Sequence, residues 1–133
     1  MAVYKDLAAV KELFVELWTE LIENTEFGPK MRKGNLSILY EVKDPDFFMY
    51  VDGHGTKFGD EAKDQDAVIK FYLSGDIAHK FWLKKLNVSK ALVTRQIRSR
   101  GPVPKVMKLL PLIKPGYEMY RKYCEKYNLP TDI

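Results

Sequence analysis

The sequence has a single cysteine, Cys124, so it cannot form a disulfide bond within the chain, which agrees with a reducing compartment. No apolar run approaches the roughly 18 to 20 residues that span a membrane. The N-terminus has no basic region followed by an apolar core, the pattern of a secretory signal. The C-terminus, Pro130-Thr131-Asp132-Ile133, lacks a peroxisomal Ser-Lys-Leu-type ending. Together these absences predict a cytoplasmic protein.

Motifs that accompany catalysis are also missing. The sequence contains no Gly-x-Ser-x-Gly, no phosphate-binding glycine loop, no His-Glu-x-x-His and no Cys-x-x-Cys. It has two histidines, and nothing places a nucleophile and a carboxylate beside His54 or His79. We expect His54 to be solvated at a turn, His79 to be exposed or hydrogen-bonded within the fold, and Cys124 to be a buried inert thiol. The sequence therefore predicts no catalytic residue, no cofactor and no metal site.

Acidic residues are scarce in the second half of the chain. Residues 1–66 hold 8 Lys or Arg against 14 Asp or Glu, whereas residues 67–133 hold 14 against 4. If the cations cluster in space, they attract anionic lipid head groups, a phosphate-bearing ligand or nucleic acid. If they are solvated, or pair with acids of the first half, they have no such role. The basic stretch at 95–100 lacks the interleaved aromatic residues that stack on nucleic-acid bases, so we expect no nucleic-acid partner.

The N-terminal segment has the pattern of an amphipathic helix. Its apolar residues recur three and four positions apart: Leu7, Val10, Leu13, Phe14, Leu17, Trp18, Leu21 and Ile22. Its polar face is acidic, and an anionic membrane surface would repel such a face. We therefore expect this helix to pack on a sheet, with Trp18 in the core. The following stretch at 26–35, with Gly28-Pro29, is predicted to be a connection.

The sequence predicts five strands further along the chain, with alternating apolar residues in the first and fourth, apolar residues on both faces of the second, and mostly polar or basic residues in the third and fifth. They cover Leu36–Lys43, Phe47–Asp52, Thr56–Glu61, Ala67–Leu73 and Arg95–Gly101. Ser74 can cap a helix that runs to Leu86, and Asn87 suits the end of that helix. After Gly101, prolines shorten or kink an apolar helix at 106–110.

Four tyrosines mark a final helix. Tyr117, Tyr120, Tyr123 and Tyr127 recur three and four positions apart after Gly116. We expect this face to pack on the body of the domain. A lid over a cavity and a contact in a homodimer remain open as alternatives.

The segment 86–116 resembles the C-terminal half of the sterol carrier protein (SCP-2 type) lipid-binding domain. The likeness lies in Leu-Asn-x-x-x-Ala-Leu-Val at 86–93, the basic strand ending at Gly101, and Val-Met-Lys-Leu-Leu at 106–110. The order of the predicted elements fits that family from about residue 4 to about residue 116. Two positions depart from it, because Lys84 and Arg95 stand where the family usually has glycine. The resemblance implies one α/β (α+β) domain over 1–133, with an about five-stranded, mostly antiparallel sheet covered by helices and an apolar cavity between them.

The resemblance also implies a function, which is the binding of a lipid-like ligand without catalysis. The ligand would be a fatty acid, a fatty acyl-CoA, a sterol-like molecule or an isoprenoid, and its transfer and transient contact with an anionic membrane stay open. The implied wall residues are Phe48, Tyr50, Ile69, Phe71, Leu73, Phe81, Trp82, Leu92, Val106, Met107 and Leu110. The implied head-group contacts are Lys84, Arg95 and Arg98. Two alternatives remain: an accessory module that docks on an enzyme, and a dry core filled by the same apolar residues.

Overall fold

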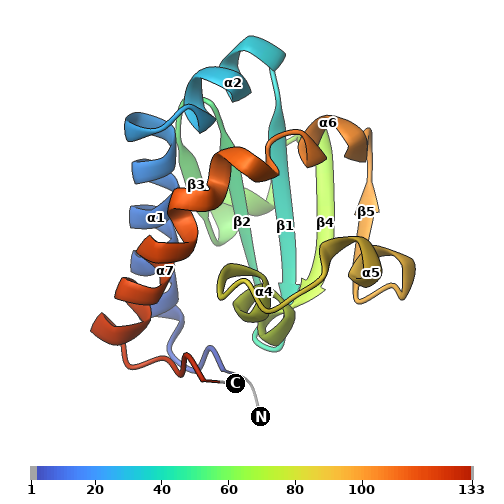
Figure 1. The fold of residues 1–133 in the computed structure, drawn as a ribbon. Coiled ribbons are helices and arrows are strands. Elements are labelled where there is room, and N and C mark those ends of the chain that lie inside the picture. Colours follow the sequence, from blue (N-terminus) through green and yellow to red (C-terminus); the bar gives the residue numbers. More distant parts are fainter. Residues whose placement is uncertain (1–2, 133) are drawn as a thin grey trace.

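The protein is a five-stranded mixed sheet with helices packed mainly on one face (Figure 1). The computed structural model describes residues 3–132, and the side chain of Val106 lies outside that description. The strands are β1 (Ser37–Lys43), β2 (Phe47–Asp52), β3 (Thr56–Phe58), β4 (Ile69–Ser74) and β5 (Ile97–Arg100), in the order β3-β2-β1-β4-β5. Only β1 and β4 pair in parallel among them, and the other neighbours are antiparallel. The mostly antiparallel α+β sheet expected from the sequence is confirmed.

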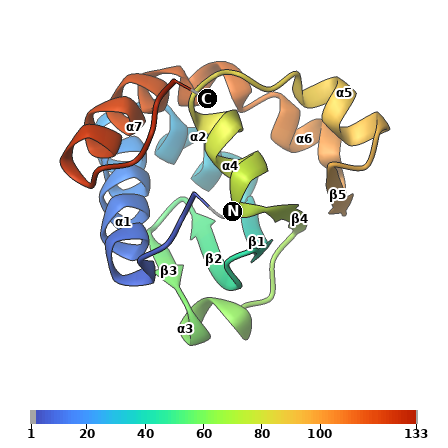
Figure 2. The same ribbon diagram turned by 90° about the horizontal axis from the view of Figure 1, so that it is seen from below.

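Helices occupy most of the chain outside the sheet. They are α1 (Leu7–Asn24), α2 (Phe27–Gly34), α3 (Asp60–Lys63), α4 (Gly75–Trp82), α5 (Val88–Val93), α6 (Val103–Met107), the 3₁₀ turn η1 (Leu110–Ile113) and α7 (Lys114–Lys126). Figure 2 shows α2, α4, α6 and α7 together on one side of the sheet, and α3 on the other. None of the helices described is both long and apolar enough to cross a bilayer.

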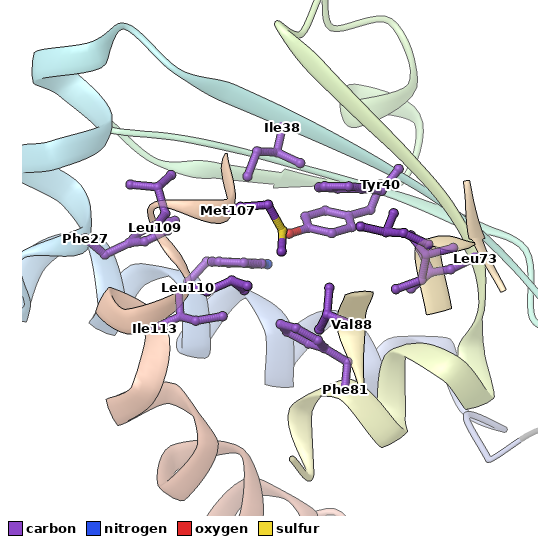
Figure 3. Close-up of a pocket in the computed structure, with 14 residues that line it drawn as sticks. Phe27, Ile38, Tyr40, Leu73, Phe81, Val88, Met107, Leu109, Leu110 and Ile113 are labelled. Atoms are coloured by element: carbon purple, nitrogen blue, oxygen red, sulfur yellow. The ribbon is translucent and has the colours of Figure 1, made fainter. Parts of the chain in front are cut away.

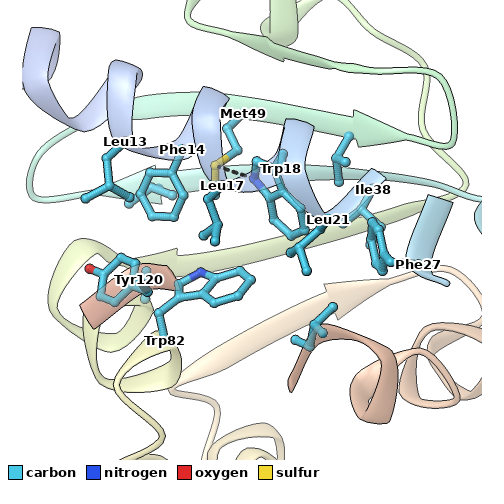
Figure 4. Close-up of a cluster of buried hydrophobic side chains, with 14 of the residues drawn as sticks. Leu13, Phe14, Leu17, Trp18, Leu21, Phe27, Ile38, Met49, Trp82 and Tyr120 are labelled. Atoms are coloured by element: carbon cyan, nitrogen blue, oxygen red, sulfur yellow. Dashed lines mark hydrogen bonds between the residues drawn. The ribbon is translucent and has the colours of Figure 1, made fainter. Parts of the chain in front are cut away.

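Helix α1 carries the largest share of the core. The carboxylate of Asp6 caps the start of α1 by accepting hydrogen bonds from the backbone amides of Ala8 and Ala9. These amides belong to the first turn of the helix and have no partner within it. From Val10 to Ile22 the apolar face of α1 is buried against the sheet, α4 and α7 (Figure 4), whereas Leu7 at its start is exposed. Within that core the indole nitrogen of Trp18 donates a hydrogen bond to the sulfur of Met49, at 3.3 Å. The predicted packing of this helix is confirmed.

The two faces of the sheet differ in what covers them. Alternation places Ile38, Tyr40, Phe71 and Leu73 on the face under the helices, because β1 and β4 pair in register at Ile38 with Ile69 and at Tyr40 with Phe71. The opposite face is covered by α3, whose buried Ala62 packs with Leu39 and Tyr50. The face under the helices is therefore the one on which a cavity between sheet and helices can form.

Two predicted segments differ in the structure. Most of the predicted connection at 26–35 is the helix α2 (Phe27–Gly34), since Pro29 falls in the first turn, where its missing amide is tolerated. This helix ends at Asn35, which adopts the left-handed conformation with φ 50°. The predicted strand Thr56–Glu61 ends at Phe58, and Asp60 and Glu61 begin α3.

The helix after β4 begins where the sequence predicted and ends earlier than predicted. Ser74 caps α4, as predicted, and accepts from the amide nitrogen of Ile77 at 3.1 Å. The helix ends at Trp82 and not at Leu86, because Lys84 takes the left-handed conformation (φ 63°) that closes a helix. Asn87 does not end α4. It caps α5 instead, accepting from the amide nitrogen of Lys90 at 3.0 Å.

Candidate functional site

An apolar cavity of about 70 Å³ lies between the helix-covered face of the sheet and the helices above it (Figure 3). Fourteen residues line it, and none carries a charge: Trp18, Phe27, Ile38, Tyr40, Phe71, Leu73, Phe81, Val88, Leu92, Ile97, Met107, Leu109, Leu110 and Ile113. Such a lining can bury an apolar group and offers an ionic group no partner.

The floor of the cavity comes from three neighbouring strands. Tyr40 of β1 lies beside Phe71 of β4, and Leu73 lies beside Ile97 of β5. Their side chains share one face because residues two apart on a strand point the same way. The floor is thus fixed by strand register.

The roof comes from short helices late in the chain. Phe81 projects from α4, Val88 and Leu92 from α5, Met107 from α6 and Leu110 from η1. All five are only half-buried, so the roof is thinner than the core beneath α1.

Tyr40 is the polar residue of the lining. Its ring stacks between those of Trp18 and Phe71, with centroid distances of 5.9 and 5.7 Å. Its hydroxyl points into the cavity towards Met107 in Figure 3, and it has no hydrogen-bond partner among the residues described. Burial raises the pKa of Tyr40 well above its ordinary value, so the phenol stays protonated.

Six of the predicted wall residues line the cavity: Phe71, Leu73, Phe81, Leu92, Met107 and Leu110. Four others do not. Phe48 and Tyr50 lie on the opposite face of the sheet with Ala62, because they alternate with the residues that face the helices. Ile69 and Trp82 are buried in the main core. Val106 lies outside the described side chains, so its predicted place stays a prediction.

The predicted head-group contacts are not part of the lining. Lys84 and Arg95 are exposed and occupy the positions that follow α4 and α5, with φ of 63° and 64°. Arg98 points to the face away from the helices, since its neighbour Ile97 points into the cavity, and its guanidinium lies 5.6 Å from the ring centre of Tyr72.

Eight lining residues were not predicted: Trp18, Phe27, Ile38, Tyr40, Val88, Ile97, Leu109 and Ile113. A signal existed for the strand residues, because Ile38 and Tyr40 alternate along a predicted strand. That signal does not say which strands are neighbours, and only the pairing of β1 with β4 brings Tyr40 to the cavity. Trp18 was predicted to lie in the core. It does pack there, and it lines the cavity as well.

A second group of polar side chains is buried beside the core. The carbonyl of Pro130 can only accept, so Nε2–H of His79 donates to it at 2.6 Å. Burial lowers the pKa of His79, and the neutral ring then accepts at Nδ1 from the hydroxyl of Tyr120, also at 2.6 Å. The oxygen of Tyr120 accepts in turn from Tyr4 at 2.5 Å. This series of hydrogen bonds joins Tyr4, near the start of the described chain, to Pro130, near its end, so His79 has a structural role.

No set of His, Cys, Asp and Glu side chains in the described part of the chain is placed to hold a metal ion. Cys124 is buried, and burial raises its pKa to about 11. His54 is exposed in the turn between β2 and β3. These placements agree with what the sequence predicted for the two histidines and the cysteine.

No protein-family model matches the sequence, and no curated protein matches it either. One structural likeness covers a small part of a larger chain, a sec-alkyl sulfatase. The TM-score is 0.50 at 11% identity, over 58% of this chain and 12% of that one.

Sterol carrier protein 2 structures are similar over most of their length. The apo protein from Yarrowia lipolytica gives a TM-score of 0.60 at 17% identity, covering 78% of this chain and 89% of that one. The domain from Helicoverpa armigera gives 0.60 at 15% identity, covering 81% and 87%. Sterol carrier protein 2 like 2 from Aedes aegypti gives 0.54 at 16%, covering 77% and 94%. The protein therefore has the fold of the sterol carrier protein 2 domain, as the sequence resemblance implied.

Proposed function

We propose that the protein binds a lipid-like ligand by burying an apolar chain in the cavity between its sheet and its late helices. The observation that carries this proposal is a lining of fourteen uncharged, almost wholly apolar side chains. The likeness to structures named as sterol carriers supports it. Fatty acids, fatty acyl-CoA, sterol-like molecules and isoprenoids are the ligand classes proposed, and the role needs no catalytic residue.

The size of the cavity sets a condition on this function. Its 70 Å³ is well below the roughly 300 to 1,000 Å³ of pockets that hold drug-sized molecules. A long chain therefore enters only if the roof moves. Met107 and Leu110 are suited to this, since both are half-buried on short helices and methionine adapts to many shapes. Each methylene group that the ligand buries contributes about 0.8 kcal/mol.

Ligand binding is tested first by native mass spectrometry of the purified protein, followed by organic extraction of anything that it carries. Binding of a fluorescent fatty acid then compares the wild type with Met107→Asp. We expect this variant to lose binding, because it places a charge in a lining that offers no counter-ion. Val93→Asp is the matched control on α5, where the side chain is 82% exposed, and it should bind as the wild type does.

Two results would count against the proposal. One is a wild-type protein that carries nothing and binds no fatty acid, acyl-CoA, sterol or isoprenoid alcohol. The other is equal loss of binding in the Met107 and Val93 variants, which would place the ligand outside the cavity. Transfer of a bound ligand between vesicles, and the cytoplasmic location, stay predictions that a transfer assay and cell fractionation address.

A second candidate function is an accessory module that presents a ligand to an enzyme. It is favoured by the likeness to 12% of a sec-alkyl sulfatase chain, which places a similar fold within a much larger enzyme. Affinity capture with the wild type and with Met107→Asp tests it. A stoichiometric partner whose activity on a lipid substrate needs the wild-type protein would favour this function over free carriage.

A further inference from the structure

The hydroxyl of Tyr40 is the one hydrogen-bonding group of the cavity lining that is left without a partner among the described residues. The other side-chain donor in the lining is the indole nitrogen of Trp18, and it is already bonded to the sulfur of Met49. The remaining lining side chains are hydrocarbon or thioether. A phenylalanine would fill the same space without a polar atom to satisfy, so the hydroxyl adds nothing to packing.

The position of this hydroxyl is fixed by the rings on either side. Tyr40 is nearly parallel to Trp18 and to Phe71, with interplanar angles of 27° and 29°. Stacking on both faces prevents the ring from swinging out of the cavity. The donor is therefore held in place before a ligand arrives, which lowers the entropic cost of binding.

We infer that the Tyr40 hydroxyl hydrogen-bonds a neutral oxygen of the ligand, a hydroxyl or carbonyl oxygen, buried in the cavity. A carboxylate does not suit this position, because no cation lines the cavity and burying an unpaired charge is costly. Within the proposed lipid-binding function, this favours ligands that enter with a neutral polar end: alcohols, ketones and esters or thioesters. A fatty acid would place its methyl end inside and lose this contact.

The test uses three probes of equal chain length: octanol, octane and octanoate. Each competes with a fluorescent fatty acid on the wild type and on Tyr40→Phe. We expect the variant to bind octanol about three- to tenfold more weakly, the range of one neutral hydrogen bond, and octane equally well or better. Because Tyr40 has no hydrogen bond in the free protein, the variant should unfold at the same urea concentration as the wild type.

Two outcomes would overturn the inference. Equal weakening of octanol and octane would make the residue a packing group only, and wild-type protein that binds octanoate as tightly as octanol would contradict the neutral-end preference. In both of these outcomes the wild-type protein still binds ligands. If the proposed function itself is wrong, the wild-type protein binds none of the three probes and no fluorescent fatty acid.

A different observation concerns charge. Residues 77–117 contain ten Lys or Arg and no Asp or Glu, and all ten cations are exposed. Four of them, which we call the basic end, follow or lie on α5 and α6: Lys90, Arg95, Lys105 and Lys108. In the described part of the chain no ion pair joins them to a carboxylate. Figures 1 and 2 both place α5, β5 and α6 at the end of the molecule away from α1.

The basic end also exposes an apolar side chain beside the cavity. Val93 of α5 is 82% exposed, and its neighbour Leu92 lines the cavity. Cations around an exposed apolar group are the composition that binds an anionic bilayer interface. By contrast, the polar face of α1 carries Glu12, Glu16 and Glu20, so α1 is unsuited to that contact.

We also propose that the basic end docks on an anionic lipid bilayer, which brings the roof of the cavity to the membrane. Vesicles of phosphatidylcholine alone and of phosphatidylcholine with phosphatidylserine are sedimented with the full protein at low and high salt. Binding should require phosphatidylserine and weaken with salt. The triple variant Lys90→Glu, Lys105→Glu, Lys108→Glu should bind about a hundredfold more weakly, since each nearby cation contributes about fivefold.

The matched control reverses three exposed lysines elsewhere: Lys5→Glu, Lys11→Glu and Lys122→Glu. It has the same net charge as the first triple variant and should bind much more tightly. An environment-sensitive dye on Val93→Cys should brighten on phosphatidylserine vesicles, and the same dye on Leu7→Cys of α1 should not. Cys124 is buried and does not compete for the label in the folded protein.

Equal loss in both triple variants would overturn the docking proposal, because it would show a response to net charge alone. The proposal would also be overturned if the dye at position 7 brightened on vesicles and the dye at position 93 did not. A protein that bound single-stranded RNA or polyglutamate but no phosphatidylserine vesicles would overturn it as well. Solution binding of the fluorescent fatty acid is measured in each variant, so that loss of docking is separated from loss of the cavity.

Discussion

Replacing Lys84 or Arg95 with glycine should stabilise the protein. Both residues adopt the left-handed backbone conformation, with φ of 63° and 64°, directly after the ends of α4 and α5. An L-residue pays about 1 to 2 kcal/mol for this conformation, whereas glycine adopts it freely. The sequence resemblance points to the same two positions, since the sterol carrier protein family usually has glycine at both.

The expected gain follows from two opposing effects. Relief of the left-handed conformation favours the folded state, but glycine also increases the conformational entropy of the unfolded chain, at a cost of about 0.4 to 1 kcal/mol. Both side chains are exposed and form no ion pair in the described structure, so little else is lost. We expect each variant to raise the free energy of unfolding by about 0.5 to 1 kcal/mol. The two changes should add, because they lie at separate helix ends.

Urea unfolding measures this gain directly, because the fluorescence of the buried Trp18 and Trp82 reports on the core. Lys90→Gly is the matched control, since Lys90 lies inside α5 and glycine there should cost about 1 kcal/mol. The reasoning would be refuted if Lys84→Gly and Arg95→Gly destabilised the protein as much as the control does. Such a result would mean that the left-handed ends are not strained.

Three further predictions concern the core and the buried titratable groups. Burial holds the pKa of His79 below its ordinary 6.5, so the unfolded chain takes up this proton at higher pH than the folded protein, and stability should fall as the pH drops below about 6.5. His79→Gln should flatten that fall in urea unfolding at a series of pH values, and an unchanged pH dependence in this variant would contradict the reasoning. The thiol of Cys124 should react with a thiol reagent only after urea unfolds the protein, and fast reaction in the native state would contradict its burial. Leu17→Ala should lower the free energy of unfolding by about 2 to 5 kcal/mol, and the exposed Leu7→Ala by less than about 0.5 kcal/mol.

The sequence predicted those elements whose signal is local. The apolar spacing of α1 and the cap at Ser74 depend on residues within one or two turns of each other, and both are as predicted. The end of α4 was missed because Lys84 does not look like a helix stop. Its left-handed conformation is set by the fold, and a lysine carries no sign of it. Helix α2 was missed for the opposite reason, since Gly28-Pro29 looks like a break.

The cavity was predicted only in part because it depends on contacts between distant segments. Phe71 and Leu73 could be assigned to one face of a strand, but alternation alone does not say whether Phe48 and Tyr50 share that face. That choice depends on the register of β1 with β2 and with β4, which joins residues 38 and 69 in parallel. The same register places Tyr40 beside Phe71, so the polar residue of the cavity is visible only once the strands are paired.

The small size of the cavity and the thinness of its roof fit one account of how a ligand enters. The floor is built on strands held by the core under α1, whereas the roof is built on α5, α6 and η1, which have six, five and four residues. Short helices gain little stability of their own, and low local stability is where proteins open first. Helix α5 is moreover bounded by Asn87, which caps its start, and by Arg95, which closes its end in a conformation unfavourable to arginine. A roof of this kind can yield to an apolar chain without disturbing the floor, so a cavity of 70 Å³ in the free protein is compatible with a larger ligand.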